Sequence, residues 1–168
     1  MKKLAIMSLL VALVAALAGS QAVANGGADD FEAELSGYEE VPQTLSSPGF
    51  GSFEAELDED APSLSFELTF GGMPTAVSAA HIHLGARATA GGVSAFLCGG
   101  GGQPACPPGG GTVTGTITPA NILGPAGQGI AAGEFDELIA AMRAGVTYAN
   151  VHTSQFPGGE IRGQIEED

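Results

Sequence analysis

The chain has 168 residues and is strongly acidic, with 19 Asp and Glu residues against five Lys and Arg. A surface of this sign repels nucleic acids and anionic lipids, so nucleic-acid binding is excluded, and the length fits one domain.

Residues 1–24 have the pattern of a secretory signal peptide. Lys2 and Lys3 begin it, residues 4–18 are apolar, and residues 22–24 form a small-residue cleavage site. The apolar run is shorter than the roughly 20 residues that a membrane span requires. We therefore expect an exported protein, secreted or periplasmic, without a membrane span after cleavage. Both lysines leave with the signal, so three arginines then oppose 19 carboxylates, a net charge of −16.

After a disordered tail expected over residues 25–30, most of the chain alternates between apolar and polar residues with a period of two. Turns rich in Gly, Pro or acidic residues divide it into segments, which predicts about eight strands. The expected strands cover residues 31–35, 53–57, 64–70, 75–84, 93–97, 112–118, 146–153 and 160–165. This count and spacing favour an all-β domain over residues 31–168, an antiparallel β-sandwich or flattened barrel.

One segment follows a helical period instead. Phe135, Leu138, Ile139 and Met142 stand at i, i+3, i+4 and i+7, which predicts a short amphipathic helix over residues 133–144. We expect its apolar stripe to cap an open end of the sandwich.

Cys98 and Cys106 are the only cysteines, and they bracket a short segment rich in glycine. In an exported protein a single close pair indicates a disulfide. A redox or metal-binding thiol pair would have C-x-x-C spacing or a nearby histidine, and neither is present.

The three histidines of the chain form the best candidate site. His81 and His83 are two residues apart in an expected strand, so they share one face about 7 Å apart while Ile82 points to the other. If His152 lies on a neighbouring strand, three imidazoles converge, a ligand set that suits copper or zinc. Two other interpretations stay open: a hydrogen-bonded structural cluster, and a metal-free catalytic role.

Five polar residues are candidates for supporting the histidines or the strands that carry them. Glu160 and Arg162 share a strand face, and we expect a cross-strand ion pair there, for example between Arg162 and Glu40. The alternative is that Glu160 orients a histidine or ligates the metal, while Arg162 attracts an anion. Asn150 and Thr153 flank His152 and are expected either to orient it or simply to finish the strand.

Four ordered motifs resemble the CHRD domain, the module repeated in chordin and found singly in many exported bacterial proteins. The resemblance runs from about Phe31 to Ile165. It implies an immunoglobulin-like β-sandwich and no settled activity. The motifs are residues 37–42 (GYEEVP), 80–85 (AHIHLG), 148–153 (YANVHT) and 156–165 (FPGGEIRGQI).

Two functions therefore stand from the sequence. The first is an exported metal-binding domain that holds copper or zinc through its three histidines. The second is a non-catalytic extracellular interaction or adhesion module with an unknown protein partner and structural histidines. No nucleophile elbow or phosphate loop occurs, so no catalytic residue is assigned and a binding role is favoured over an enzymatic one.

Overall fold

A computed structural model describes residues 29–58 and 60–168. The predicted signal peptide and residues 25–28 of the predicted tail lie outside the described residues, and Asp30 already begins the first strand. The elements are β1 (Asp30–Ser36), β2 (Phe50–Asp58), β3 (Ser63–Gly71), β4 (Val77–Leu84), β5 (Gly92–Cys98), β6 (Gly111–Ile117), α1 (Phe135–Arg143), β7 (Thr147–Thr153), β8 (Ile161–Gln164) and β9 (Glu166–Glu167).

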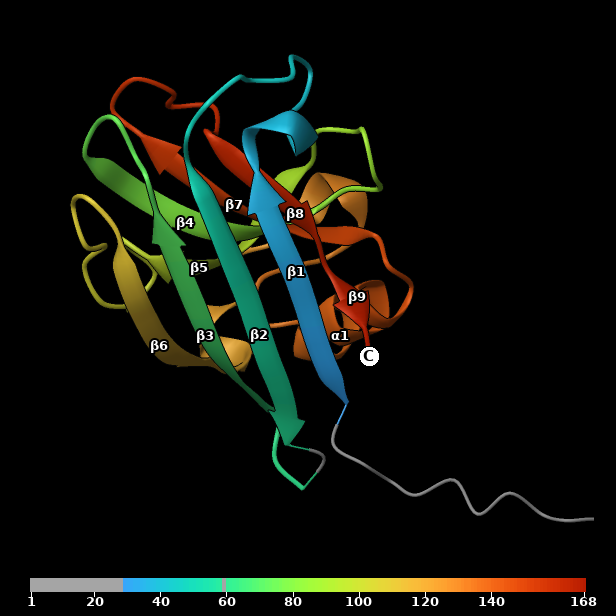
Figure 1. The fold of residues 1–168 in the computed structure, drawn as a ribbon. Coiled ribbons are helices and arrows are strands. Elements are labelled where there is room, and N and C mark those ends of the chain that lie inside the picture. The colour runs from blue at the N-terminus through green and yellow to red at the C-terminus, as the bar shows by residue number, and fades with distance from the viewer. Residues whose placement is uncertain (1–28, 59) are drawn as a thin grey trace, which may run out of the picture.

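The strands form one antiparallel sheet in the order β5-β4-β7-β8-β1-β2-β3-β6, and β9 pairs with β1. Its two ends, β5 and β6, approach each other, so the sheet is nearly closed into a flattened barrel (Figure 1). The prediction of an all-β antiparallel domain with one helix is confirmed. The strand pairing across β8 and β1 brings the end of the chain beside the start of the domain.

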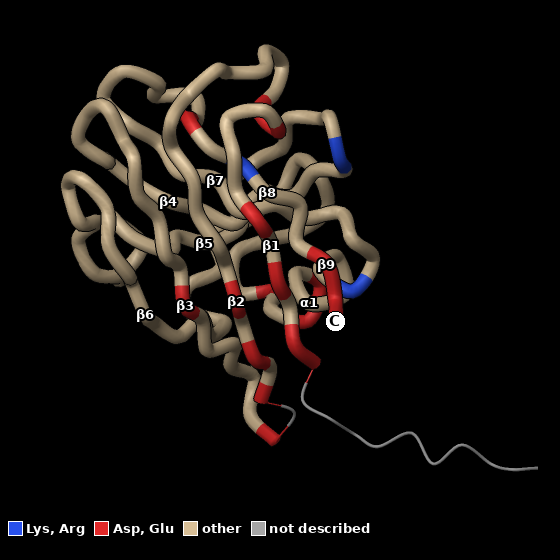
Figure 2. Tube along the Cα trace, viewed as in Figure 1, with Lys and Arg blue, Asp and Glu red and all other residues tan. Residues whose placement is uncertain are grey.

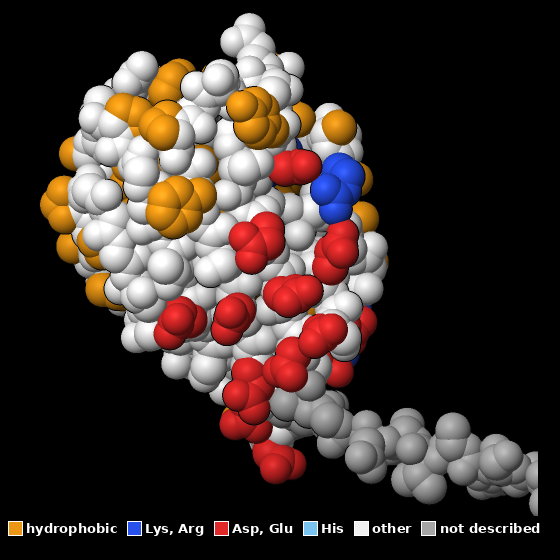
Figure 3. Space-filling view, in the orientation of Figure 1, with side chains coloured by type: hydrophobic (Ala, Val, Ile, Leu, Met, Phe, Trp, Pro, Cys, Tyr) orange, Lys and Arg blue, Asp and Glu red, His pale blue; other side chains and the backbone are white. Residues whose placement is uncertain are grey.

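The period of two in the sequence decides which side chains fill the barrel. On β3 the four apolar residues of the predicted inward face are buried, and in register Phe53 of β2 pairs with Leu68. The alternate residues point outward. Glu32, Glu54 and Glu67 are register partners across β1, β2 and β3. Acidic residues gather along the lower half of these strands (Figure 2), and their side chains cover that part of the face (Figure 3).

Helix α1 confirms the predicted amphipathic segment. Its stripe, Phe135, Leu138, Ile139 and Met142, is buried in the same core as the strands. Figure 1 places the helix at the end of the barrel where β1 begins and β9 ends, which agrees with the expected capping position. Among the described residues, no helix is long and apolar enough to cross a membrane.

The two cysteines form a disulfide, as predicted, with their Cα atoms 5.1 Å apart. The loop that they close lies against the ring of Phe96. A Cβ added at Gly100 would come within 2.6 Å of that ring, and one at Gly101 within 2.8 Å. A larger residue at either position would therefore have to displace the Phe96 ring, which favours glycine here.

We expect loss of this disulfide to cost about 2.5 kcal/mol of unfolding free energy, the entropy of closing so short a loop in the unfolded chain. The measurement is urea unfolding of the wild type and of Cys98→Ala/Cys106→Ala. Wild type treated with a strong reductant serves as the control and should lose a similar amount. Unchanged stability in both would contradict the prediction.

Candidate metal centre

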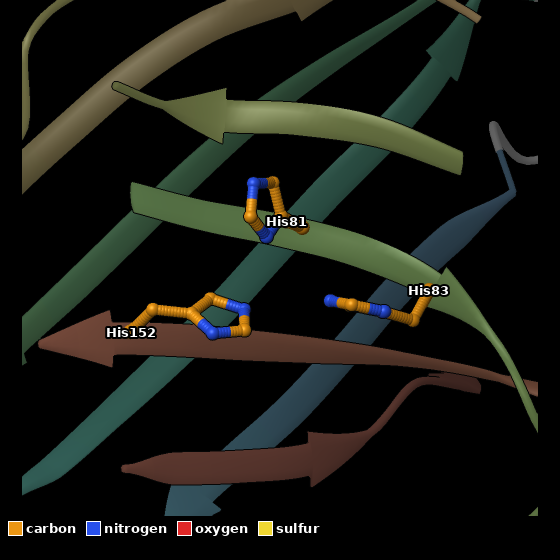
Figure 4. A group of neighbouring side chains, drawn as sticks. All are labelled: His81, His83 and His152. Carbon is orange, nitrogen blue, oxygen red and sulfur yellow. The ribbon is translucent and has the colours of Figure 1, made fainter. Parts of the chain in front are cut away.

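The three histidines come from two neighbouring strands. His81 and His83 lie on β4 and His152 on β7, and the register places Ala79 of β4 opposite His152. Ile82, between the first two, is fully buried in the barrel core. The histidines therefore share the sheet face that points away from the core, as the strand spacing predicts, and their rings lie side by side (Figure 4).

Although they lie on the outer face, the histidines are shielded from water. Their exposed fractions are 9% for His81, 7% for His83 and 8% for His152. Two aromatic side chains contribute to the cover. Phe96 of β5 packs edge-on against His81 with ring centroids 4.4 Å apart, and Tyr148 of β7 stacks on His83 at 4.8 Å with an interplanar angle of 6°.

Backbone carbonyl groups orient two of the rings. Nδ1 of His83 lies 3.0 Å from the carbonyl oxygen of Gly91, and Nδ1 of His152 lies 3.1 Å from that of Pro157. A carbonyl oxygen only accepts, so Nδ1 carries the proton in both rings and Nε2 of each neutral ring holds a free lone pair. This is the second contact that metal-ligating histidines usually make.

The nitrogen atoms that remain are buried and converge. Within the described part of the chain, Nδ1 of His81 and Nε2 of His83 and His152 are buried without a hydrogen-bond partner. The candidate ligand atoms of the three residues lie within 4.8 Å of one another. A metal ion centred among three atoms so spaced would lie about 2.8 Å from each, so ligation at about 2.0 to 2.1 Å would draw each ring inward by less than about 1 Å.

Burial keeps all three histidines neutral. It lowers the pKa of His81 to about 3 and that of His83 to about 4, with repulsion from the neighbouring imidazoles as a smaller cause. Burial also lowers the pKa of His152. Neutral imidazoles offer their lone pairs to a metal without first losing a proton.

Glu160 lies in the interior but bonds to hydroxyl groups. It has no exposed surface, and its two carboxylate oxygens accept hydrogen bonds of 2.6 Å from Ser47 Oγ and Thr153 Oγ1. The hydrogen bonds that orient His83 and His152 come from the carbonyl groups described above and not from Glu160. Thr153 thus ties the end of β7 to the residue before β8.

Glu40, Asn150 and Arg162 are also buried, in a different arrangement from the one expected. The Asn150 amide donates to Glu40 Oε1 and to the carbonyl oxygen of Ile161. Burial raises the pKa of Glu40. Among the described residues, no ion pair joins Arg162 to Glu40, so the cross-strand pair suggested by the sequence is not formed.

The residues that complete the site carry little signal in the sequence. Phe96 and Tyr148 sit at alternating strand positions typical of any sheet face, and Gly91 and Pro157 act through backbone atoms whose role the sequence does not mark. Only the pairing of Phe96 with His81 and of Tyr148 with His83 across the sheet shows their place in the site.

Comparison with known proteins identifies one family. The family model described as CHRD domain matches residues 31–165, which run from β1 past the end of β8 and include all three histidines. No curated protein and no solved structure gives a significant match to the chain.

Proposed function

The chain belongs to the CHRD domain family, and we propose that it binds one copper or zinc ion through His81, His83 and His152. The observation that carries the proposal is the convergence of three buried ring nitrogens without hydrogen-bond partners in the described structure. Imidazole nitrogen suits both metals, and three protein ligands leave one coordination position open.

The same observation weighs against histidines that serve only as structural hydrogen-bonding groups. Leaving a buried polar atom unpaired costs about 1 to 3 kcal/mol. In a purely structural cluster these nitrogens would form hydrogen bonds with neighbouring groups. In the described structure all three lack a hydrogen-bond partner and lie close to one another. A bound metal ion satisfies them together.

We place this metal-binding protein outside the cytoplasm. A disulfide between Cys98 and Cys106 persists in oxidising compartments, and residues 1–24 carry the signal-peptide pattern. N-terminal sequencing of the protein recovered from the extracellular or periplasmic fraction tests this placement. Recovery only from the cytoplasm, with the N-terminal segment retained, would refute it.

Metal analysis of protein purified without a histidine tag tests the site. After removal of metal with a chelator, reconstitution and dialysis, we expect one equivalent of copper or zinc per wild-type chain. His83→Ala should retain less than about a tenth of it, because the two remaining histidines bind a metal ion far more weakly than three.

The control is Leu138→Ala, which opens a cavity in α1 within the core and so destabilises the fold without touching a ligand. It should retain one equivalent. Sub-stoichiometric metal in the wild type, or full metal in His83→Ala, would rule out the three-histidine site and favour the interaction module.

A further inference from the structure

A buried arginine lies beside the proposed metal centre, connected to it by stacked rings. Arg162 of β8 is 2% exposed, and its guanidinium carbon lies 3.5 Å from the centroid of the Tyr148 ring. Tyr148 in turn stacks on His83 at 4.8 Å. The guanidinium is thus separated from the His83 ring by no more than these two successive spacings. A fixed positive charge therefore lies near the site that would hold a cation.

This charge has only neutral direct partners. The guanidinium donates to the carbonyl oxygens of Thr89 at 2.8 Å and Ala86 at 3.2 Å, and to Oε1 of Gln164 at 3.4 Å. None of the ion pairs found in the described structure includes it. Glu39 and Glu40 act on it only from beyond ion-pair distance. Its field is thus not cancelled at close range.

The strands around the histidines add no negative charge of their own. Strands β4, β5, β7 and β8 contain no Asp or Glu. Carboxylates gather instead on the face of β1, β2 and β3 (Figure 3). Glu160 precedes β8, and its two oxygens accept hydrogen bonds from hydroxyl groups and not from a histidine. Of the two groups that act electrostatically on His83, His152 is itself neutral, whereas Arg162 carries a charge and opposes added positive charge.

These features discriminate between metal ions by charge. A divalent ion is repelled by Arg162 twice as strongly as a monovalent ion at the same place. For a separation of about 8 Å and an effective dielectric constant of about 20 to 40, the extra charge weakens binding roughly six- to thirty-fold. The ligand set does not decide between the two metals, because imidazole suits both and three histidines with one water also hold zinc. The discrimination therefore comes from the charge of Arg162.

We propose that this centre selects copper(I) over zinc(II) and that Arg162 is the residue that sets this preference. The proposal rests on the three-histidine site proposed above. Arg162 acts through its charge, behind Tyr148, and does not itself ligate the metal.

The test compares the dissociation constants of the full chain for copper(I) and for zinc(II). Copper(I) is measured under nitrogen by competition with bicinchoninate, with ascorbate as reductant, and zinc(II) by competition with a chromophoric chelator. The wild type should bind copper(I) more tightly. In Arg162→Gln the preference for copper(I) should fall about tenfold, and Arg162→Lys, which keeps the charge, should stay closer to the wild type.

Arg87→Gln is the matched control. Arg87 is exposed and forms ion pairs with Glu39 and Glu166, so solvent and these carboxylates screen its charge. Its loss should leave the preference unchanged. An unchanged preference in a folded Arg162→Gln protein would overturn the role of Arg162.

If Arg162→Gln does not fold, the preference for copper(I) is tested on the wild type alone, by reducing its bound copper. Protein loaded with copper(II) should accept one electron per copper from ascorbate, lose its electron paramagnetic resonance signal and retain the metal as copper(I). Tighter binding of zinc(II), or a copper(II) signal that persists in ascorbate, would refute the copper(I) preference alone. A chain that binds neither ion would refute the proposed site itself.

Discussion

Replacing Gly91 with alanine is expected to destabilise the fold by about 3 kcal/mol and to remove metal binding. A Cβ at this position would stand 1.7 Å from the carbonyl oxygen of Leu84 and 2.5 Å from its carbonyl carbon. Both are backbone atoms of β4, so the clash cannot be relieved by rotating a side chain. The loop must move away from the strand.

This movement would reach the site directly because the backbone of Gly91 holds two of its rings. The Gly91 carbonyl oxygen accepts from His83 Nδ1, and the Gly91 amide donates to Tyr148 Oη at 3.0 Å. Losing both contacts frees the His83 ring and its stacked neighbour. We therefore expect a loss of metal even at temperatures where the variant stays folded.

Urea unfolding and metal analysis at pH 7 measure the two effects. Gly109→Ala is the matched control, since a Cβ there meets nothing within 4 Å. Its stability should stay within about 0.5 kcal/mol of the wild type, with full metal. A Gly91→Ala protein as stable and as fully loaded as Gly109→Ala would show that the loop does not hold the ring.

The metal-free protein is expected to lose about 4 kcal/mol of stability between pH 7 and pH 5. The folded-state pKa is lowered to about 3 for His81 and about 4 for His83, whereas the pKa of an unperturbed histidine is 6.5. Below pH 6.5 His81 and His83 therefore bind protons in the unfolded chain but stay unprotonated in the folded chain. Stability falls as the pH falls through this window, by about 2 kcal/mol per histidine at pH 5. His152 contributes in the same direction.

Denaturant unfolding of the metal-free protein at pH 7, 6 and 5 measures this loss. His83→Gln is the comparison, because glutamine does not titrate, and its loss over the same range should be smaller by about 2 kcal/mol. Stability that does not change between pH 7 and pH 5 would show that the histidines accept protons without unfolding the site.

The strands and the helix could be predicted from the sequence where a repeating pattern of apolar residues indicates which side chains are buried. Alternation in residues 64–70 marks which side chains face the core, and the stripe from Phe135 to Met142 marks one helix face. The same rule placed His81 and His83 on one face. It required only that Ile82 belong to the core, which its apolar character indicates.

The parts that the sequence did not reveal depend on contacts between distant segments. Arg162 looked like half of an ion pair, yet its direct partners include the carbonyl groups of residues 86 and 89, brought to it by the loop between β4 and β5. Backbone acceptors leave no pattern in side-chain types. The closing of the sheet from β5 round to β6 likewise depends on pairings that no local segment encodes.

The glycine run between the two cysteines has a composition that usually indicates a flexible linker. In this fold its backbone packs closely against an aromatic ring. Gly100 and Gly101 lie against Phe96, and Phe96 packs on His81. The glycine run therefore supports the candidate ligand His81 indirectly, through the Phe96 ring. A bulkier residue in this glycine run would push the Phe96 ring toward the His81 imidazole. The absence of side chains in this glycine run is therefore what keeps the space around His81 fixed.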